Sequence, residues 1–246
     1  MKARARVRSQ HGFTLAELLV ACAVIAFVMA GLLTMLQSGQ QSYLVGSRQI
    51  EAQQNLRVAI DRMVDEIRNA GFCPTCETLP VTANCPNTPT VGNTTPVRGF
   101  AAILPDNTNP ATKVTIQNDW DGSGAINTVS TVNYTVVGAD GTPTTTQRGE
   151  QITYTYNAGT GTLTRQEVII DATPVTLVTG ITSLSFTYFD VGNPVNPNGN
   201  TTATSQCIRS VGISMTTQPS VQGQATMQGK ILVTMGDTVR LRNRSN

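Results

Sequence analysis

The sequence is poor in histidine, in aromatic residues and in charge. Its single histidine, His11, lies within the first twelve of 246 residues; aromatic residues make up 5% of the chain and charged residues 13%. Beyond His11 there is therefore no histidine for a catalytic triad, a general base or a Cys/His zinc site. No glycine-rich phosphate-binding loop is present either. These absences argue against an enzyme.

The positive charge is concentrated at the start of the chain. The formal net charge is +2, and four of the 17 basic residues are Lys2, Arg4, Arg6 and Arg8. Without them, 13 basic residues face 15 acidic ones and the side-chain charge becomes −2. The remaining chain has no basic patch of the kind that binds nucleic acid.

An almost wholly apolar segment, residues 13–36, follows this basic start. As a helix, it would extend roughly 36 Å at about 1.5 Å per residue, enough to cross a bilayer core of about 30 Å with some tilt. The basic residues before it predict a cytoplasmic start, and everything after residue 36 is then expected outside the membrane.

One carboxylate, Glu17, interrupts the apolar segment. An ionisable group there costs a few kcal/mol on insertion scales and suggests a function, although a shallow Glu17 could also reach the interface. A secretory signal peptide could be cut near Ala21-Cys22-Ala23, and residues 19–22 resemble a lipoprotein cleavage box. Such a cut would leave a short apolar run containing Glu17 on one side and an exposed apolar end on the other. A plain membrane anchor has no need of Glu17.

Residues 12–19, GFTLAELL, resemble the prepilin signature of type IV pilins and type II secretion pseudopilins. The motif matches except at Ala16, where Ile, Val or Met is more usual. The resemblance implies that prepilin peptidase cuts after Gly12 and that the new N-terminal residue, Phe13, is N-methylated. Glu17 would then be the fifth residue of the mature chain.

Cleavage after Gly12 would create an α-amino cation at Phe13, one helical turn from Glu17. In a packed fibre the Glu17 carboxylate could pair with the amine of a neighbouring subunit or with its own. Either pairing relieves two buried charges, because opposite charges attract most strongly where water is scarce. We therefore expect Glu17 to act in assembly and not in catalysis.

A second helical pattern follows the apolar segment. Leu56, Ile60, Met63 and Ile67 recur with helical period and predict one apolar stripe, with charged residues on the rest of the surface. Gly71 is a plausible stop. The sequence thus predicts one long helix over about 14–70 whose second half packs its stripe on a globular domain, with Gly39 and Gly46 as the two positions where the helix could be loosened.

Residues 73–246 have a β-rich composition, with all 12 prolines and most threonines. Alternating β-branched runs predict strands at 97–104, 113–117, 126–137, 151–156, 163–170, 181–189, 208–216 and 229–242. Residues 152–157 and 163–170, joined by a glycine-rich loop, predict a hairpin. The expected fold is α+β, a pilin-like long N-terminal helix packed on a mostly antiparallel sheet.

Further segments refine the resemblance. Residues 61–72 look like the helix end of PilW-type minor pilins and of the related J-type pseudopilins of type II secretion. Residues 183–190 and 237–243 are also similar to that subgroup, whereas residues 73–180 carry little family signal. The resemblance implies four parts: a cleaved leader (1–12), a transmembrane and filament-core helix (13–36), an amphipathic helix (37–72) and a β-rich periplasmic or extracellular domain (73–246).

Four cysteines lie on the expected outer side: Cys73, Cys76, Cys85 and Cys207. Their spacing could suggest zinc, but an oxidising compartment and an even count favour two disulfides. Three connectivities are possible, and in each Cys207 joins the 73–85 segment. Such a bond closes a long loop and should stabilise the fold by a few kcal/mol.

A possible calcium loop begins at Asp119. Asp119, Asp121 and Ser123 supply side-chain oxygens at positions 1, 3 and 5, Gly124 stands at position 6, and Ala125 offers a backbone carbonyl at position 7. Position 12 lacks the usual glutamate, and no flanking helices are expected. The alternative is a tight Asp-Gly hairpin turn between two strands that needs no metal. No other cofactor is expected.

Together these features predict a non-enzymatic minor pilin that takes part in type IV pilus assembly or initiation. Its expected partners are prepilin peptidase, other major and minor pilins through their N-terminal helices, and the inner-membrane assembly platform. It would cross the inner membrane once, with the C-terminal domain in the periplasm, and then join a pilus at the cell surface. The alternatives are a type II secretion pseudopilin and a pilus-associated adhesin whose Thr/Asn-rich loops bind a ligand.

Overall fold

The computed structural model describes residues 12–74, 79–81, 95–97, 100–137, 139–195, 205–218 and 232–244. The chain divides into two compact units, Met1–Ser47 and Arg48–Asn246. The secondary structure is one long helix followed by antiparallel strands, which confirms the predicted α+β class with pilin-like architecture.

Helix α1, Leu15–Arg68, is continuous over 54 residues, so neither Gly39 nor Gly46 interrupts it. It ends as predicted: residues 69–71 form a turn in which Gly71 has a φ of 75°. Glycine is the common residue after a helix because this left-handed conformation costs it little. The Gly71 N–H then donates to the Gln117 carbonyl oxygen at 2.8 Å, which joins the helix end to a strand.

The described strands are mostly short. They are β1 (Leu79–Val81), β2 (Thr95–Val97), β3 (Ile103–Pro105), β4 (Lys113–Gln117), β5 (Val132–Val137), β6 (Pro143–Arg148), β7 (Gln151–Asn157), β8 (Thr162–Glu167), β9 (Val175–Val178), β10 (Ile181–Asp190), β11 (Asn193–Val195), β12 (Ser210–Thr217) and β13 (Val233–Arg240). A short 3₁₀ helix, η1 (Arg242–Arg244), follows β13.

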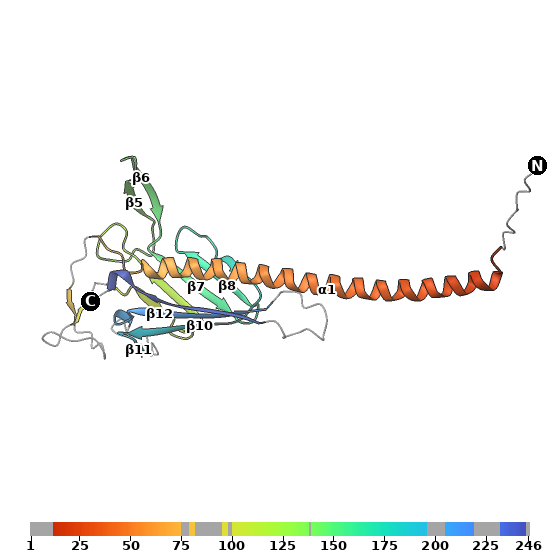
Figure 1. Cartoon of the computed structure of the whole chain (residues 1–246). Helices are drawn as coiled ribbons and strands as arrows, with labels where there is room; N and C mark the ends of the chain where they lie inside the picture. The colour runs from red at the N-terminus through yellow and green to blue at the C-terminus, as the bar shows by residue number, and fades with distance from the viewer. Residues whose placement is uncertain are drawn as a thin grey trace, which may run out of the picture. The chain divides into compact units, whose positions relative to one another are not determined.

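The strands form two larger sheets and two hairpins, with antiparallel pairing throughout (Figure 1). One sheet has the order β3-β4-β7-β8-β9 and the other the order β11-β10-β12-β13. The pairs β1-β2 and β5-β6 stand apart as two-stranded sheets. The predicted hairpin is confirmed, because β7 pairs with β8 across a turn at residues 158–161.

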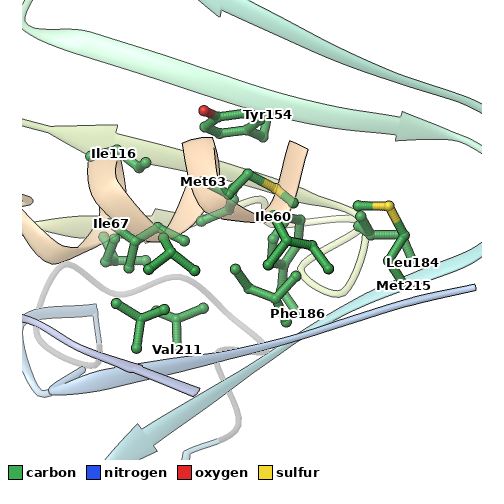
Figure 2. Packing of buried hydrophobic residues seen from close by; sticks show 14 of the residues in the cluster. Ile60, Met63, Ile67, Ile116, Tyr154, Leu184, Phe186, Val211 and Met215 are labelled. Carbon is green, nitrogen blue, oxygen red and sulfur yellow. The ribbon is translucent and has the colours of Figure 1, made fainter. Parts of the chain in front are cut away.

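The last four turns of α1 supply the centre of the core. Leu56, Ile60, Met63 and Ile67 are all buried, which confirms the predicted stripe. Figure 2 shows three of them lying between side chains of the two larger sheets. The sheet residues labelled there are Ile116 and Tyr154 from one sheet and Leu184, Phe186, Val211 and Met215 from the other. Both sheets alternate buried and outward residues along β7 and β10, as a half-buried strand requires.

Several predicted strand boundaries were wrong. Within the predicted run 97–104, residues 100–102 lie outside the strands, and β5 begins only at Val132 instead of residue 126. Strand β8 ends at Glu167, since residues 168–170 turn and Ile169 adopts a φ of 79°. Strand β6 was missed altogether because all six of its residues are exposed and show no alternation.

Candidate functional site

The prepilin-like segment begins just before α1. Gly12, Phe13 and Thr14 precede the helix, and the Phe13 side chain is 88% exposed. The N–H and the hydroxyl of Thr14 both donate to Oε2 of Glu17 at 2.9 Å. The Glu17 N–H donates back to the Thr14 hydroxyl oxygen at 3.3 Å. Thr14 and Glu17 therefore form a reciprocal capping box at the helix start.

The capping box was not foreseen, although the spacing Thr14-x-x-Glu17 is its sequence signal. It satisfies N–H groups that a helix start leaves without partners, which matters most in lipid, where no water replaces them. The Oε2 atom takes both bonds from Thr14, while Oε1 accepts none from the described residues. The carboxylate is thus oriented with one oxygen open to another donor. Pairing of that oxygen with the Phe13 amine of a cleaved subunit stays a prediction.

The first part of α1 exposes an extended apolar surface. Every residue from Gly12 to Leu44 is exposed. Among the described residues, α1 is the one helix long and apolar enough to cross a membrane. Exposed apolar patches of this size mark a membrane or protein interface, and the basic residues before the segment agree with a membrane anchor.

A charged network joins the second part of α1 to the five-stranded sheet. The Glu66 carboxylate accepts hydrogen bonds from the Arg62 Nε at 2.7 Å, from the Tyr154 hydroxyl at 2.6 Å and from the Arg165 guanidinium at 3.0 Å. Arg165 also pairs with Glu167 at 3.0 Å. The sequence indicated a solvated charged face here, but Glu66 is only 13% exposed. The network is structural: it fixes helix against sheet with charge-assisted hydrogen bonds.

The loop that starts at Asp119 is organised by buried carboxylates. Asp119 is fully buried; its Oδ1 accepts the N–H of Gly122 and of Ser123 at 2.7 and 3.0 Å, and its Oδ2 accepts that of Gly124 at 2.6 Å. Asp121 accepts the Ser123 N–H at 2.9 Å. The alternative predicted from the sequence is right about a tight Asp-Gly turn but wrong about a hairpin, because β4 before the loop and β5 after it belong to different sheets.

Glu150, just before β7, completes this group and was missed from the sequence. It is 1% exposed and accepts the backbone N–H of Trp120 at 2.9 Å and of Asn127 at 2.6 Å. Ligand oxygens of Asp119, Asp121 and Glu150 lie within 4.8 Å of one another, which is close enough for one metal ion. Only the fold brings residue 150 to the loop, so spacing along the chain offered no signal.

Burial and mutual repulsion set the charge behaviour of the three carboxyls. Burial raises the pKa of Asp119 and of Glu150, and the negative charges of Asp121 and Asp119 raise the pKa of Glu150 further. For Asp121, burial also acts upward, but bonds from Ser123 and the contact with Asp119 bring its pKa below the ordinary value. A bound cation would stabilise such a cluster, because its charge offsets the repulsion between the carboxylates.

The other two predicted calcium ligands are already engaged with each other. The Ser123 hydroxyl donates to the Ala125 carbonyl oxygen at 3.1 Å. A cation in the loop would have to compete for both atoms or leave them aside. The donors that fit a hard cation best are therefore the carboxylates of Asp119, Asp121 and Glu150, and calcium binding stays a prediction.

Two of the four outer cysteines lie in the described part of the chain. Cys73 and Cys207 are both disulfide-bonded and both buried. The Cys73 sulfur lies 3.1 Å from Oδ2 of Asp119, next to the acidic loop. Cys76 and Cys85 lie outside the described residues, so the pairing stays a prediction. Cys22, in the apolar part of α1, is free and exposed.

Comparison with known proteins agrees with the start of the chain. Residues 7–33 match the family described as the prokaryotic N-terminal methylation motif. No curated protein matches the chain. The match confirms the predicted prepilin-type motif, places it at the start of α1, and is consistent with a type IV pilin-like protein.

Proposed function

We propose that this chain is a minor pilin of a type IV pilus, a structural subunit and not an enzyme. The observation that carries the proposal is the methylation motif at residues 7–33, which overlaps the start of α1 in a segment where every residue from Gly12 to Leu44 is exposed. In this role prepilin peptidase removes residues 1–12 and Phe13 becomes the methylated N-terminus. The apolar segment is held in the inner membrane until it packs with other pilin helices, while residues 73–246 face the periplasm and then the cell surface.

The capping box supports a specific part for Glu17 in that assembly. Thr14 holds one carboxylate oxygen at 2.9 Å and leaves the other without a donor among the described residues. An incoming subunit presents a Phe13 amine near the same depth in the membrane. The pairing of these charges would set the register between helices, because each is costly alone in a low-dielectric environment.

Exchange of Glu17 tests this role. Glu17→Gln keeps a hydrogen-bonding side chain of the same size but removes the charge, and the variant should be processed but fail to enter filaments. Thr14→Ser, which keeps the hydroxyl, serves as the matched control and should assemble. Normal incorporation of Glu17→Gln into filaments would show that the charge has no part in assembly.

A type II secretion pseudopilin is the second candidate, since the same motif and helix serve both systems. Deletion of the protein should abolish surface pili and leave enzyme secretion intact. Loss of secreted enzymes with normal pili would instead identify a pseudopilin. The assignment to PilW-type minor pilins is part of the minor-pilin proposal. It rests on the resemblance of three segments, residues 61–72, 183–190 and 237–243, and on their order along the chain.

A calcium site at Asp119, Asp121 and Glu150 is a separate proposal about the same chain. It is supported by the closeness of the three carboxylates and by the raised pKa of the two buried ones. In this proposal the ion would brace the loop between β4 and β5.

A further inference from the structure

A small open pocket lies between the end of α1 and the region where β4 ends and β7 begins. Its volume is about 210 Å³, and its wall includes Trp120 and Ile152. Drug-sized ligands occupy roughly 300–1,000 Å³, so this pocket suits a smaller molecule. All of its lining residues belong to the unit Arg48–Asn246.

Trp120, the single tryptophan of the chain, is held in place from several sides. Its indole N–H donates to the Gly149 carbonyl at 3.2 Å, its ring packs 5.3 Å from that of Phe72, and the Arg148 guanidinium lies 5.1 Å from its centroid. A fixed indole is a preorganised apolar wall that costs little entropy when a ligand binds.

The polar side chains around this wall retain unused hydrogen-bonding capacity. Asn118 is 3% exposed; its Oδ1 accepts the Phe72 N–H at 3.2 Å, but its amide nitrogen has no acceptor among the described residues. This amide nitrogen is therefore a donor that a ligand in the pocket could use. The Asn69 side-chain oxygen and the Asp65 carboxylate are acceptors without a described donor.

The charges of the pocket cancel. Arg62 and Arg148 face Asp65 and Glu66, and the Glu66 oxygens are already occupied by Arg62, Arg165 and Tyr154. A charged ligand would meet a like charge on one side, whereas a neutral ligand would not. Free donors (Asn118, Arg148) and free acceptors (Asn69, Asp65) stand around one small cavity. A hydroxyl group can form hydrogen bonds with both the donors and the acceptors, because it donates and accepts.

From this combination we infer that the pocket binds one ring of a neutral carbohydrate. Ring hydroxyls would bond to Asn118, Asp65 and Arg148, and the apolar C–H face of the ring would lie against Trp120 and Ile152. Ligand binding here goes beyond the proposed filament role and does not depend on it, since none of these residues lies in the apolar part of α1.

Saturation-transfer NMR on the full chain tests the inference. The protein is held in a detergent without a sugar head group, and glucose, galactose and N-acetylglucosamine are added one at a time at about 10 mM, which is enough to detect a dissociation constant in the millimolar range. At least one should show transfer to its ring protons. Glucuronate, which carries a charge, and a short threonine-rich peptide serve as comparison ligands.

Two pairs of variants show whether the signal comes from this pocket. Asp65→Asn and Arg148→Gln should each weaken binding about tenfold, the usual effect of losing a hydrogen bond to a charged group. Asp61 and Arg57 are exposed on α1 outside the pocket. The control variants Asp61→Asn and Arg57→Gln should therefore bind the sugar like the unaltered chain. Unchanged far-ultraviolet circular dichroism and thermal unfolding would show that the variants fold.

Three results would overturn the inference. They are no transfer to any of the three neutral sugars, equal binding by Asp65→Asn and Arg148→Gln, and binding of the peptide in place of the sugars. The last would make the pocket a protein-docking site. Filament assembly is scored separately, so its failure leaves this result unaffected.

Discussion

Tyr154 illustrates how single residues fix the helix to the sheet. It lies fully buried on β7 and donates its hydroxyl to the Glu66 carboxylate of α1 at 2.6 Å. Burial, together with the Glu66 charge, raises the pKa of Tyr154 above its ordinary value of 10. The folded chain therefore keeps this proton at pH values where the unfolded chain loses it.

Tyr154→Phe tests this contact through its pH dependence. At neutral pH the variant should lose about 1.5–3 kcal/mol of unfolding free energy, because a hydrogen bond to a charged group is removed. Because the folded-state pKa of Tyr154 lies above the unfolded-state pKa, its contribution to the free energy of unfolding is complete below pH 10. That contribution is lost as the pH rises further. The gap between Tyr154→Phe and the unaltered chain should therefore narrow above pH 10 in chemical denaturation.

Tyr188→Phe is the matched control for the cost measured at neutral pH. Tyr188 is also buried, but its hydroxyl donates to a neutral group, the Pro110 carbonyl oxygen, at 2.7 Å. Its loss should cost about 0.5–1.5 kcal/mol at neutral pH. An equal cost for both variants would contradict a special contribution from the Glu66 charge.

The calcium prediction also belongs to the residue scale. Calcium at millimolar concentration should give heat in calorimetry and change the fluorescence of Trp120, whose backbone N–H donates to Glu150. Asp121→Asn should weaken both signals, because it removes one of the three carboxylate ligands. Asp121 is chosen because it is the exposed member of the cluster, so its exchange should disturb the fold least. Asp140→Asn, an exposed aspartate on another loop, should leave them unchanged. Absence of heat in the unaltered chain would rule out the site.

At the scale of elements, the helix was predictable and parts of the sheets were not. The stripe Leu56–Ile67 follows helical period, and Gly71 has the conformation that ends a helix, so local pattern was sufficient. Strand β6 carries no alternation because both of its faces are exposed. Glu150 joined Asp119 only through tertiary structure, and Glu66 looked solvated because its partner Arg165 lies 99 residues away.

The packing of α1 can be tested with one buried and one exposed residue of the same helix. Met63 is fully buried between the two larger sheets, whereas Val58 is 69% exposed. Met63→Ala should cost about 2–5 kcal/mol of unfolding free energy through lost contacts and a residual cavity. Val58→Ala should change it by less than about 0.5 kcal/mol. Similar losses in thermal unfolding would contradict the burial of this stripe.

At the scale of the whole molecule, the chain combines two units with different chemistry. The unit Met1–Ser47 carries the methylation motif and an exposed apolar helix, and the unit Arg48–Asn246 carries the core, the disulfide-bonded cysteines and the sugar-sized pocket. An exposed helix of this kind requires lipid or other helices around it. The family match covers only residues 7–33, so the β-rich unit had to be interpreted from its own residues.

The most direct test of the account is mass spectrometry of the N-terminal peptide of the native protein extracted from membranes. We expect a chain that begins at Phe13 and carries one added methyl group on its α-amine. A chain that still contains residues 1–12, or that begins at a lipid-modified Cys22, would contradict the account.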